Sequence, residues 1–340
     1  MSRRPRILAI DAGGSKVDAV LLGSDGRVRG AARVANTDHD GTGGDRHMES
    51  ALDAVRAACR DAGVDPEMLP VADLGIYCVA GADLPQDDRR IGRWLARRGV
   101  TTEDVVRNDT FAVLRAGTDR PWGVGIVCGY GINCSAVSPS GRTYRFPAVG
   151  PISGDWGGGA DIGGTALWYA IRAEDGRGEP TSLRTLVPAA LGMRRPRQVL
   201  EALYFGRLHS GDLVQLPPTV FAAAREGDAV ARSIVDRQAD EVVALARASI
   251  RKLRMSDLDV DVVLGGGIFR NDDPSFFERV TEGIRAVAPA AQIHVLRIPP
   301  VVGAALLGLD RIGARRATHA RAREALTHER LGAHTHDGRT

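Results

Sequence analysis

The stretch ILAIDAGGSK, residues 7–16, decides how the rest of this sequence is understood. Four aliphatic residues lead to Asp11, and two glycines, a serine and a lysine follow. The apolar run predicts a buried strand. Gly13 and Gly14 lack a Cβ atom, so backbone N–H groups there can turn toward a bound anion. Ser15 adds a hydroxyl donor and Lys16, one of only two lysines in the chain, adds a positive charge.

Asp11 has a separate predicted role. It could hold a Mg²⁺ ion through water, because Mg²⁺ binds few carboxylates and keeps most of its waters. Residues 11–16 therefore favour one half of a phosphate-binding site. A tight hairpin whose glycines serve only the turn is the alternative.

A pattern of strand, glycine turn, strand, turn and strand occurs twice. It covers residues 6–35 and returns at 122–146, where CGYGINC (128–134) supplies the second glycine turn. Helical patterns follow each copy. A repeat of this kind predicts two related halves, each a mixed sheet with flanking helices, and hence an α/β protein.

The expected domain limits follow from this repeat. We place an N-terminal domain at 1–117 and a C-terminal domain with a helical insertion at 118–298. A helix at 299–314 is expected to return to the region between them. Residues 315–340 are polar and rich in arginine and histidine, and we expect a mobile tail.

Composition narrows the class of protein. The 340 residues are 44% hydrophobic, which is ample for a large core, and the net charge is +3. Aromatic residues make up 5% and do not interleave with the arginine clusters, so we expect no nucleic-acid partner. No stretch approaches the ~20 apolar residues of a membrane span, so no membrane association is expected. The four cysteines form no CxxC pair, which favours reduced, buried thiols in a cytoplasmic protein.

Two further glycine-rich stretches carry predicted binding roles. The second glycine turn could bind a polyphosphate from the side opposite the first hairpin, through Gly129, Tyr130, Gly131 and Asn133. LGGGIFRN, residues 264–271, ends a buried strand, and its three glycines permit close approach of a flat group such as adenine–ribose. Neither a dinucleotide-binding fingerprint nor a P-loop is present. Loop geometry alone is the alternative for each stretch.

Three polar residues are candidates for chemistry. Asp109 lies between a predicted strand and helix and could accept a proton from a substrate hydroxyl; a simple N-cap is the alternative. Asp155 lies among the seven glycines of residues 149–171 and could accept two sugar hydroxyls, or form only an Asx turn. Asn36, in the loop after the third strand, could reach the same cleft or be an ordinary loop residue.

The order of these motifs resembles that of the sugar kinase/Hsp70/actin superfamily. Within it, residues 6–312 are similar to the N-acetylglucosamine kinase-like group, grouped with the BadF/BadG/BcrA/BcrD ATPase family. The resemblance implies two actin-like domains around a cleft that binds ATP and Mg²⁺, with Asp109 as the catalytic base. It further implies a set of ligand contacts: residues 11–16 and Gly129 to Asn133 for phosphates; Gly265, Gly266, Gly267 and Gly303 for adenosine; and Asn36, Asn108, Asp109, Gly154 and Asp155 for the sugar.

Two positions depart from the family pattern. Tyr130 replaces the threonine of a common GTG motif, which keeps a hydroxyl but places it on a bulky ring. Trp156 replaces the glutamate often found in GDEGSG, and it could stack on a pyranose face or fill space. These departures leave the identity of the sugar open.

The resemblance implies a kinase that transfers the γ-phosphate of ATP to a hydroxyl of an amino sugar, N-acetylglucosamine or glucosamine, at the 6-OH. The alternative is an ATPase that activates a partner enzyme without a sugar substrate. Those activators share an iron–sulfur cluster between two subunits, and Cys128 and Cys134 lie in a poor place for that. A ligand-sensing regulator would need a DNA-binding segment, and we expect none. A homodimer is common among similar proteins.

Overall fold

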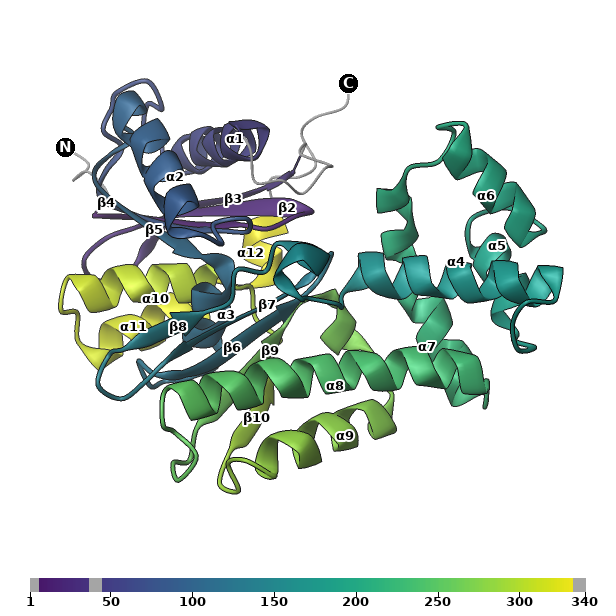
Figure 1. The fold of residues 1–340 in the computed structure, drawn as a ribbon. Coiled ribbons are helices and arrows are strands. Elements are labelled where there is room, and N and C mark those ends of the chain that lie inside the picture. Colours follow the sequence, from purple (N-terminus) through teal and green to yellow (C-terminus); the bar gives the residue numbers. More distant parts are fainter. Residues whose placement is uncertain (1–5, 37–44, 333–340) are drawn as a thin grey trace.

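The computed structural model describes residues 6–36 and 45–332, and the first half contains a five-stranded mixed sheet (Figure 1). The strands lie in the order β3-β2-β1-β4-β5. β2 is antiparallel to both β1 and β3, whereas β4 is parallel to β1 and β5 to β4. Their bounds are β1 Ile7–Ala12, β2 Lys16–Leu22, β3 Val28–Ala35, β4 Ala72–Val79 and β5 Thr101–Asn108.

The second half contains another five-stranded sheet with the same plan. Its strands lie in the order β10-β9-β6-β7-β8. β7 is antiparallel to both β6 and β8, whereas β9 is parallel to β6 and β10 to β9. The bounds are β6 Gly123–Cys128, β7 Ile132–Val137, β8 Thr143–Arg145, β9 Asp261–Gly265 and β10 Gln292–Val295. The predicted α/β fold with a repeated mixed sheet is therefore confirmed.

Helices cover both faces of each sheet. On the outer face of the first sheet, Leu8 and Ile10 pack against α1 (Asp45–Asp61) and α2 (Pro85–Arg98). On the outer face of the second sheet lie α8 (Ala229–Lys252) and α9 (Pro274–Arg285). Successive side chains of a strand point to opposite faces, so Ile7 and Ala9 face inward.

Two helices occupy the space between the sheets (Figure 1). They are α3 (Asp109–Gly117) and α10 (Val301–Arg311). Gly303 lets them approach closely, since a Cβ atom there would lie 1.8 Å from the carbonyl oxygen of Ala112. The pair thus forms a shared middle layer that both halves of the molecule contact.

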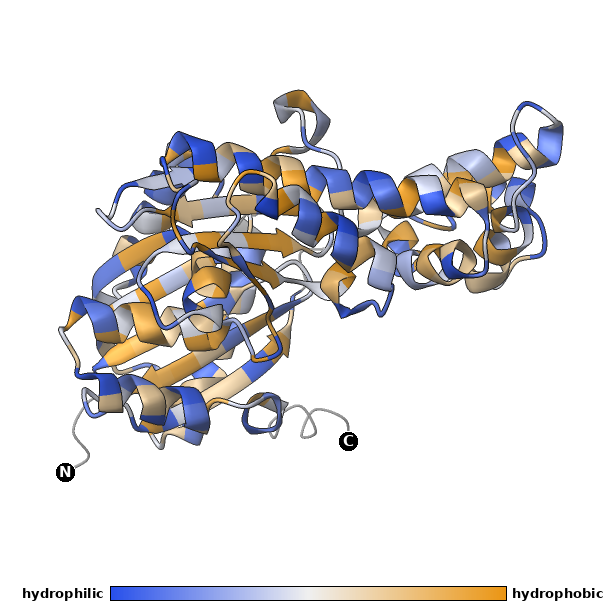
Figure 2. Ribbon diagram, turned by 90° about the horizontal axis from the view of Figure 1, so that it is seen from below, coloured by the Kyte–Doolittle hydropathy of each residue, from blue (hydrophilic) through white to orange (hydrophobic). Residues whose placement is uncertain are grey.

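A helical extension projects from the second sheet (Figure 1). It consists of α4 (Gly159–Asp175), α5 (Leu183–Ala190), α6 (Pro196–Tyr204) and α7 (Pro217–Arg225), with the short helices η1 (Gly150–Ser153) and η2 (Ser210–Gln215) beside it. Figure 2 shows hydrophobic residues along the strands and hydrophilic ones on outer helix faces. Within the described residues, no helix is both long and apolar enough to cross a bilayer.

The prediction of a mobile tail from residue 315 is wrong for residues 316–332. These form α11 (Arg316–Ala325) and α12 (His328–Gly332), whose Leu326 and Leu331 are buried. Arg323 donates to the carbonyl oxygens of Ala116 and Thr118 at the end of α3. Buried apolar side chains and the contacts of Arg321, Arg323 and Arg330 therefore fix a segment whose composition suggests disorder. His334 and His336 lie outside the described residues.

Candidate active site

Asp109 lies at the edge where parallel strands of the first sheet end. It is the first residue of α3, directly after β5, and Asp11 is near the end of β1. Backbone N–H groups, including that of Thr110, donate to the Asp109 carboxylate, but burial outweighs them and raises its pKa to about 6. This carboxyl is ionised at neutral pH and close enough to its pKa to act as a general base.

Asn108 caps the helix that carries Asp109. Its side-chain oxygen accepts from the backbone N–H of Thr110 at 3.0 Å, so the alternative of Asp109 as the N-cap is wrong. Its amide nitrogen donates to Asp83 at 2.9 Å. Because Asn108 is 1% exposed and its amide is engaged at both ends, the structure gives it a structural role. We leave it out of the proposed sugar site.

Asp11 is a buried carboxyl with acidic neighbours. Burial, Asp18 and Asp109 raise its pKa well above the usual range, while Lys16 and Arg33 oppose this. Asp18 itself is fully buried and forms a bidentate pair with Arg33 at 2.6 and 2.7 Å. A buried carboxylate with another nearby is a setting that a divalent cation relieves, so Asp11 fits a water-mediated Mg²⁺ ligand. The described residues contain no cluster of three or more possible metal ligands.

The first glycine hairpin is supported by side chains. The backbone closes from Gly13 N–H to the Lys16 carbonyl at 3.0 Å. The side-chain nitrogen of Asn36 contacts the carbonyl oxygen of Gly13 at 3.0 Å and Nδ1 of His47 at 2.8 Å. Nε2 of His47 lies 3.1 Å from the carbonyl oxygen of Ala12. Asn36 thus braces the hairpin from a 5% exposed position, and its predicted sugar contact stays a prediction.

The second glycine hairpin faces the first. A Cβ atom on Gly14 would lie 4.0 Å from Cβ of Tyr130, so the two bends approach each other across the molecule. Tyr130 is 43% exposed. The carbonyl oxygens of Gly129 and Tyr130 accept from the backbone N–H groups of Gly159 and Ala160 at 2.8 and 3.0 Å. The start of α4 therefore supports the second hairpin from behind.

The third glycine stretch packs on the second hairpin. Gly266 has φ of +105°, and a Cβ atom there would lie 2.3 Å from the carbonyl oxygen of Cys128. Gly265 lies against Val113 of α3, whereas Gly267 begins the short helix η3 (Gly267–Arg270) with open space around it. Gly303 is buried between helices, so we leave it out of the proposed adenosine site.

Asp155 follows η1 at the entry to the helical extension. Gly154 precedes it with φ of +84°, and the Ser153 hydroxyl donates to its carboxylate. The neighbouring Trp156 is partly buried, and the guanidinium of Arg237 lies 4.0 Å from its ring centroid. Cation–π contact therefore occupies one ring face, so Trp156 partly fills space here. Stacking of a sugar on Trp156 stays a prediction, and it concerns only the part of the ring that Arg237 does not cover.

Asp83 is a residue that the sequence reasoning missed. It follows β4, which runs parallel to β1 and β5, so its loop reaches the same edge as Asp11 and Asp109. Its carboxylate accepts from the side chains of Asn108 and Asn133, each at 2.9 Å. The signal was present in the sequence, since GAD at 81–83 ends a predicted strand as NDT at 108–110 does.

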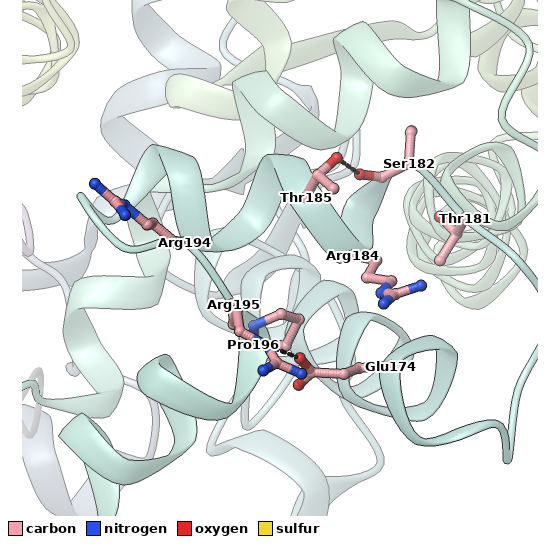
Figure 3. Close-up of a pocket in the computed structure, with 8 residues that line it drawn as sticks. All are labelled: Glu174, Thr181, Ser182, Arg184, Thr185, Arg194, Arg195 and Pro196. Carbon is pink, nitrogen blue, oxygen red and sulfur yellow. Dashed lines mark hydrogen bonds and ion pairs between the residues drawn. The ribbon is translucent and has the colours of Figure 1, made fainter.

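A separate pocket of about 380 Å³ lies in the helical extension (Figure 3). Glu174 and Arg195 form an ion pair in it at 2.9 Å, and its other lining residues are hydroxyls, arginines and a proline. None of the predicted site residues lines it.

Sequence comparison connects this arrangement to known proteins. The sequence model of the BadF/BadG/BcrA/BcrD ATPase family matches residues 8–308. An N-acetyl-D-glucosamine kinase from Dictyostelium discoideum is 26% identical over 313 residues, covering 89% of this chain and 97% of the relative. An N-acetylmuramic acid/N-acetylglucosamine kinase from Clostridium acetobutylicum is 28% identical over 192 residues, covering 56% and 63%.

Solved structures share the two-domain architecture. A candidate N-acetylglucosamine kinase from Chromobacterium violaceum has a TM-score of 0.70 and 22% identity, with 89% of this chain and 99% of that chain covered. A ROK hexokinase from Thermus thermophilus has a TM-score of 0.52 and 20% identity, with 90% and 99% covered. At these identities the likeness shows the fold alone, and it confirms the predicted actin-like sugar kinase fold.

Proposed function

We propose that this chain, which belongs to the BadF/BadG/BcrA/BcrD ATPase family, is an ATP-dependent sugar kinase. It transfers the γ-phosphate to a hydroxyl of an amino sugar, N-acetylglucosamine or glucosamine, at the 6-OH. The names of the two curated relatives support this choice of sugar. A small-molecule substrate and ATP are the partners that this reaction needs.

The arrangement around Asp109 carries the proposal. A carboxyl with a pKa of about 6 lies close enough to Asp11, near the end of β1, to raise the pKa of Asp11, and the two glycine bends that follow β1 and β6 face each other. A kinase needs a base beyond the terminal phosphate, whereas simple nucleotide hydrolysis does not require a sugar-facing carboxylate. The position of Asp109 is therefore better explained by transfer to a hydroxyl.

The chain would act mainly by positioning and by neutralising charge. Asp109 accepts the proton of the attacking hydroxyl, and Asp155 accepts hydrogen bonds from sugar hydroxyls. Backbone N–H groups of the two hairpins, with Lys16, hold the phosphates. Mg²⁺ supplies charge neutralisation on the phosphate oxygens when bound, and Asp11 would hold it through water.

The reductase-activator alternative loses support from the cysteines. Cys59, Cys78, Cys128 and Cys134 are all buried, and burial raises the thiol pKa of each. A cluster shared between two subunits needs accessible thiolates. This chain offers none of its four cysteines in that form.

A sugar-panel assay tests the proposal. Purified protein is given ATP and Mg²⁺ with N-acetylglucosamine, glucosamine, N-acetylmuramic acid or glucose, and both ADP and phosphorylated sugar are measured. We expect ADP release that depends on an amino sugar and matches the sugar phosphate formed. ADP release that no sugar in the panel changes would favour the ATPase instead.

Substitution of the proposed catalytic base, Asp109, provides a second test of the kinase activity. Asp109→Asn should lower the rate of transfer by about 10²–10⁴-fold, the usual contribution of a general base. Binding of ATP should change less than about threefold, because Asn keeps the shape of the side chain. Asp104→Asn, on the preceding strand β5 and hydrogen-bonded to Thr101, is the matched control. An Asp109→Asn variant with normal kcat would remove Asp109 from this role.

A further inference from the structure

The loop that follows β4 joins the two halves of the molecule at the candidate site. Asn108 and Asn133 donate to the same oxygen of Asp83, Oδ1, each at 2.9 Å. Asn108 belongs to the first sheet and caps the helix of Asp109, whereas Asn133 belongs to β7 and follows the second glycine hairpin. One carboxyl oxygen therefore connects the base-bearing helix to the opposite hairpin.

The amide of Asn133 is held in the orientation that this contact needs. Its side-chain oxygen accepts from the backbone N–H of Cys134 at 2.7 Å, which directs its nitrogen toward Asp83. The side chain of Asn133 is thus engaged within the protein, and its predicted phosphate contact would have to come from its backbone.

A second contact crosses between the halves on the same loop. Arg145 of β8 donates to the carbonyl oxygen of Ala82 at 3.1 Å and forms a bidentate pair with Asp88 at 3.1 and 2.8 Å. Residues 82–88 are consequently held by two neighbouring strands of the second sheet. Such contacts fix how far the two halves stand apart.

The groups around Asp83 indicate that its carboxyl oxygen acts as a hydrogen-bond acceptor and that its negative charge is not needed for this. Burial, Asp109 and Asp87 raise its pKa to about 7, while Arg145 and the hydrogen bond from Asn133 oppose this. A carbonyl oxygen has two lone pairs and can accept two amide hydrogen bonds without a charge. An asparagine at this position can therefore supply both hydrogen bonds.

We propose that Asp83 is a positioning residue: its Oδ1 holds Asn108 and Asn133 together and so sets Asp109 at the correct distance from the second glycine hairpin. The proposal rests on the proposed kinase activity for its kinetic consequences. Its structural consequence, a link between the two halves, does not depend on which reaction occurs.

Kinetics of four variants test the role. Asp83→Ala and Asn133→Ala should each lower kcat of sugar phosphorylation by about 10–100-fold, because a displacement of about 1 Å at an active site costs this much. The Kd for ATP should change less than about threefold. The double variant should be no slower than the slower single variant, since both remove the same link. Asp83→Asn should retain kcat within about threefold.

A matched control separates this role from loop stability. Asp87→Ala alters the same loop, where Asp87 accepts from Leu84 N–H at 2.9 Å and lies 3.8 Å from Arg90, and it should keep normal kcat. Asp83→Asn as slow as Asp83→Ala, or additive losses in the double variant, would overturn the positioning role. Loss of kcat in Asp87→Ala equal to that in Asp83→Ala would overturn it as well.

Small-angle X-ray scattering makes the test independent of the reaction. Without nucleotide, Asp83→Ala should have a larger radius of gyration than the wild type and Asp83→Asn, measured below each melting temperature, because the link between the halves is lost. This holds even if the wild type phosphorylates no sugar, in which case the kinase proposal fails and the link stands. Equal radii of gyration of ligand-free Asp83→Ala and wild type would disprove the link, whatever the activity.

Discussion

The two glycine hairpins share a sequence pattern but differ in what supports them. The first, at Gly13 and Gly14, is held by side chains: Asn36 contacts its carbonyl oxygens and His47 contacts the preceding strand. The second, at Gly129 and Gly131, is held by backbone: N–H groups at the start of α4 donate to its carbonyls. The supporting residues lie 23 and 35 residues away along the chain at the first hairpin and 30 residues away at the second, so the difference is one of distance in space: backbone support requires that two segments of main chain come very close.

This difference explains where the glycines are needed. Open space surrounds Gly129 and Gly131 themselves, but Gly158 and Gly266 would place a Cβ atom 2.5 and 2.3 Å from the hairpin backbone. The glycines that the second hairpin requires are therefore the ones that approach it from behind. The first hairpin instead requires an amide and an imidazole in the right positions.

The largest expected effect would come from adding one carbon behind the second hairpin. Gly158→Ala places Cβ 2.5 Å from the backbone of Gly131 and forces an alanine to φ of +87°. Overpacking and the left-handed backbone should together cost about 3 kcal/mol of unfolding free energy, measured by urea denaturation. Gly164→Ala in α4, the helix that follows Gly158, has open space and should be neutral or stabilising by up to about 1 kcal/mol. Equal unfolding free energies of the two variants would contradict the requirement for glycine at position 158.

The next effect concerns charge on the first hairpin. Burial and Arg33 lower the pKa of Lys16, and its ammonium is the hairpin's only side-chain cation. Lys16→Ala should raise KM for ATP by roughly tenfold, the equivalent of about 1.4 kcal/mol, since a charge-assisted contact to phosphate is lost. The chain supplies its own control in Lys252→Ala, which changes the only other lysine, at the end of α8. A normal KM in Lys16→Ala would show that the two hairpins bind phosphate by backbone alone.

Low pH should lower kcat/KM through Asp109, which lies in the half of the molecule that carries the first hairpin. Asp109 has a pKa raised to about 6, so it becomes protonated as the pH falls through that value and can no longer accept a proton. We expect kcat/KM to fall about tenfold per pH unit below about 6, from a pH–rate profile. In Asp83→Asn the break should stay near the same pH, because Asp83 is not the base. A flat profile between pH 5 and 7 would contradict this assignment.

The smallest effect should come from removing the amide brace of the first hairpin. Asn36→Ala loses contacts to Gly13 and Gly14, which should cost about 1 kcal/mol of stability. If the brace is its main role, KM for ATP should rise about threefold while KM for the sugar stays constant. Steady-state kinetics with both substrates decide this, because a rise in the sugar KM alone would restore Asn36 to the sugar site.

The sequence predicts the strands and hairpins well because their signals are local. Alternating apolar residues and glycine turns define β1 to β3 and β6 to β8 without knowledge of the rest of the chain. The position of Asp109 after a strand is equally local. These elements supply three of the five strands of each sheet and the centre of the candidate site.

The roles of Asn36, Asn108 and Asp83 could not be predicted in this way. Each depends on a partner from another part of the chain: His47 for Asn36, Asp83 for Asn108 and Asn133 for Asp83. Single-sequence patterns specify which face a residue takes, but not which remote group meets it. The same holds for residues 316–332, where docking onto α3 overrides a polar composition.

The middle layer has a consequence for how the protein is made. The inner face of the first sheet, with Ile7 and Ile76, is covered by α10, whose Gly308 lies directly against Ile7. That helix follows the last strand of the second sheet, so it is synthesised only after both sheets. A nascent first half therefore displays an uncovered apolar sheet face until α10 has left the ribosome, and it would need a chaperone to avoid aggregation.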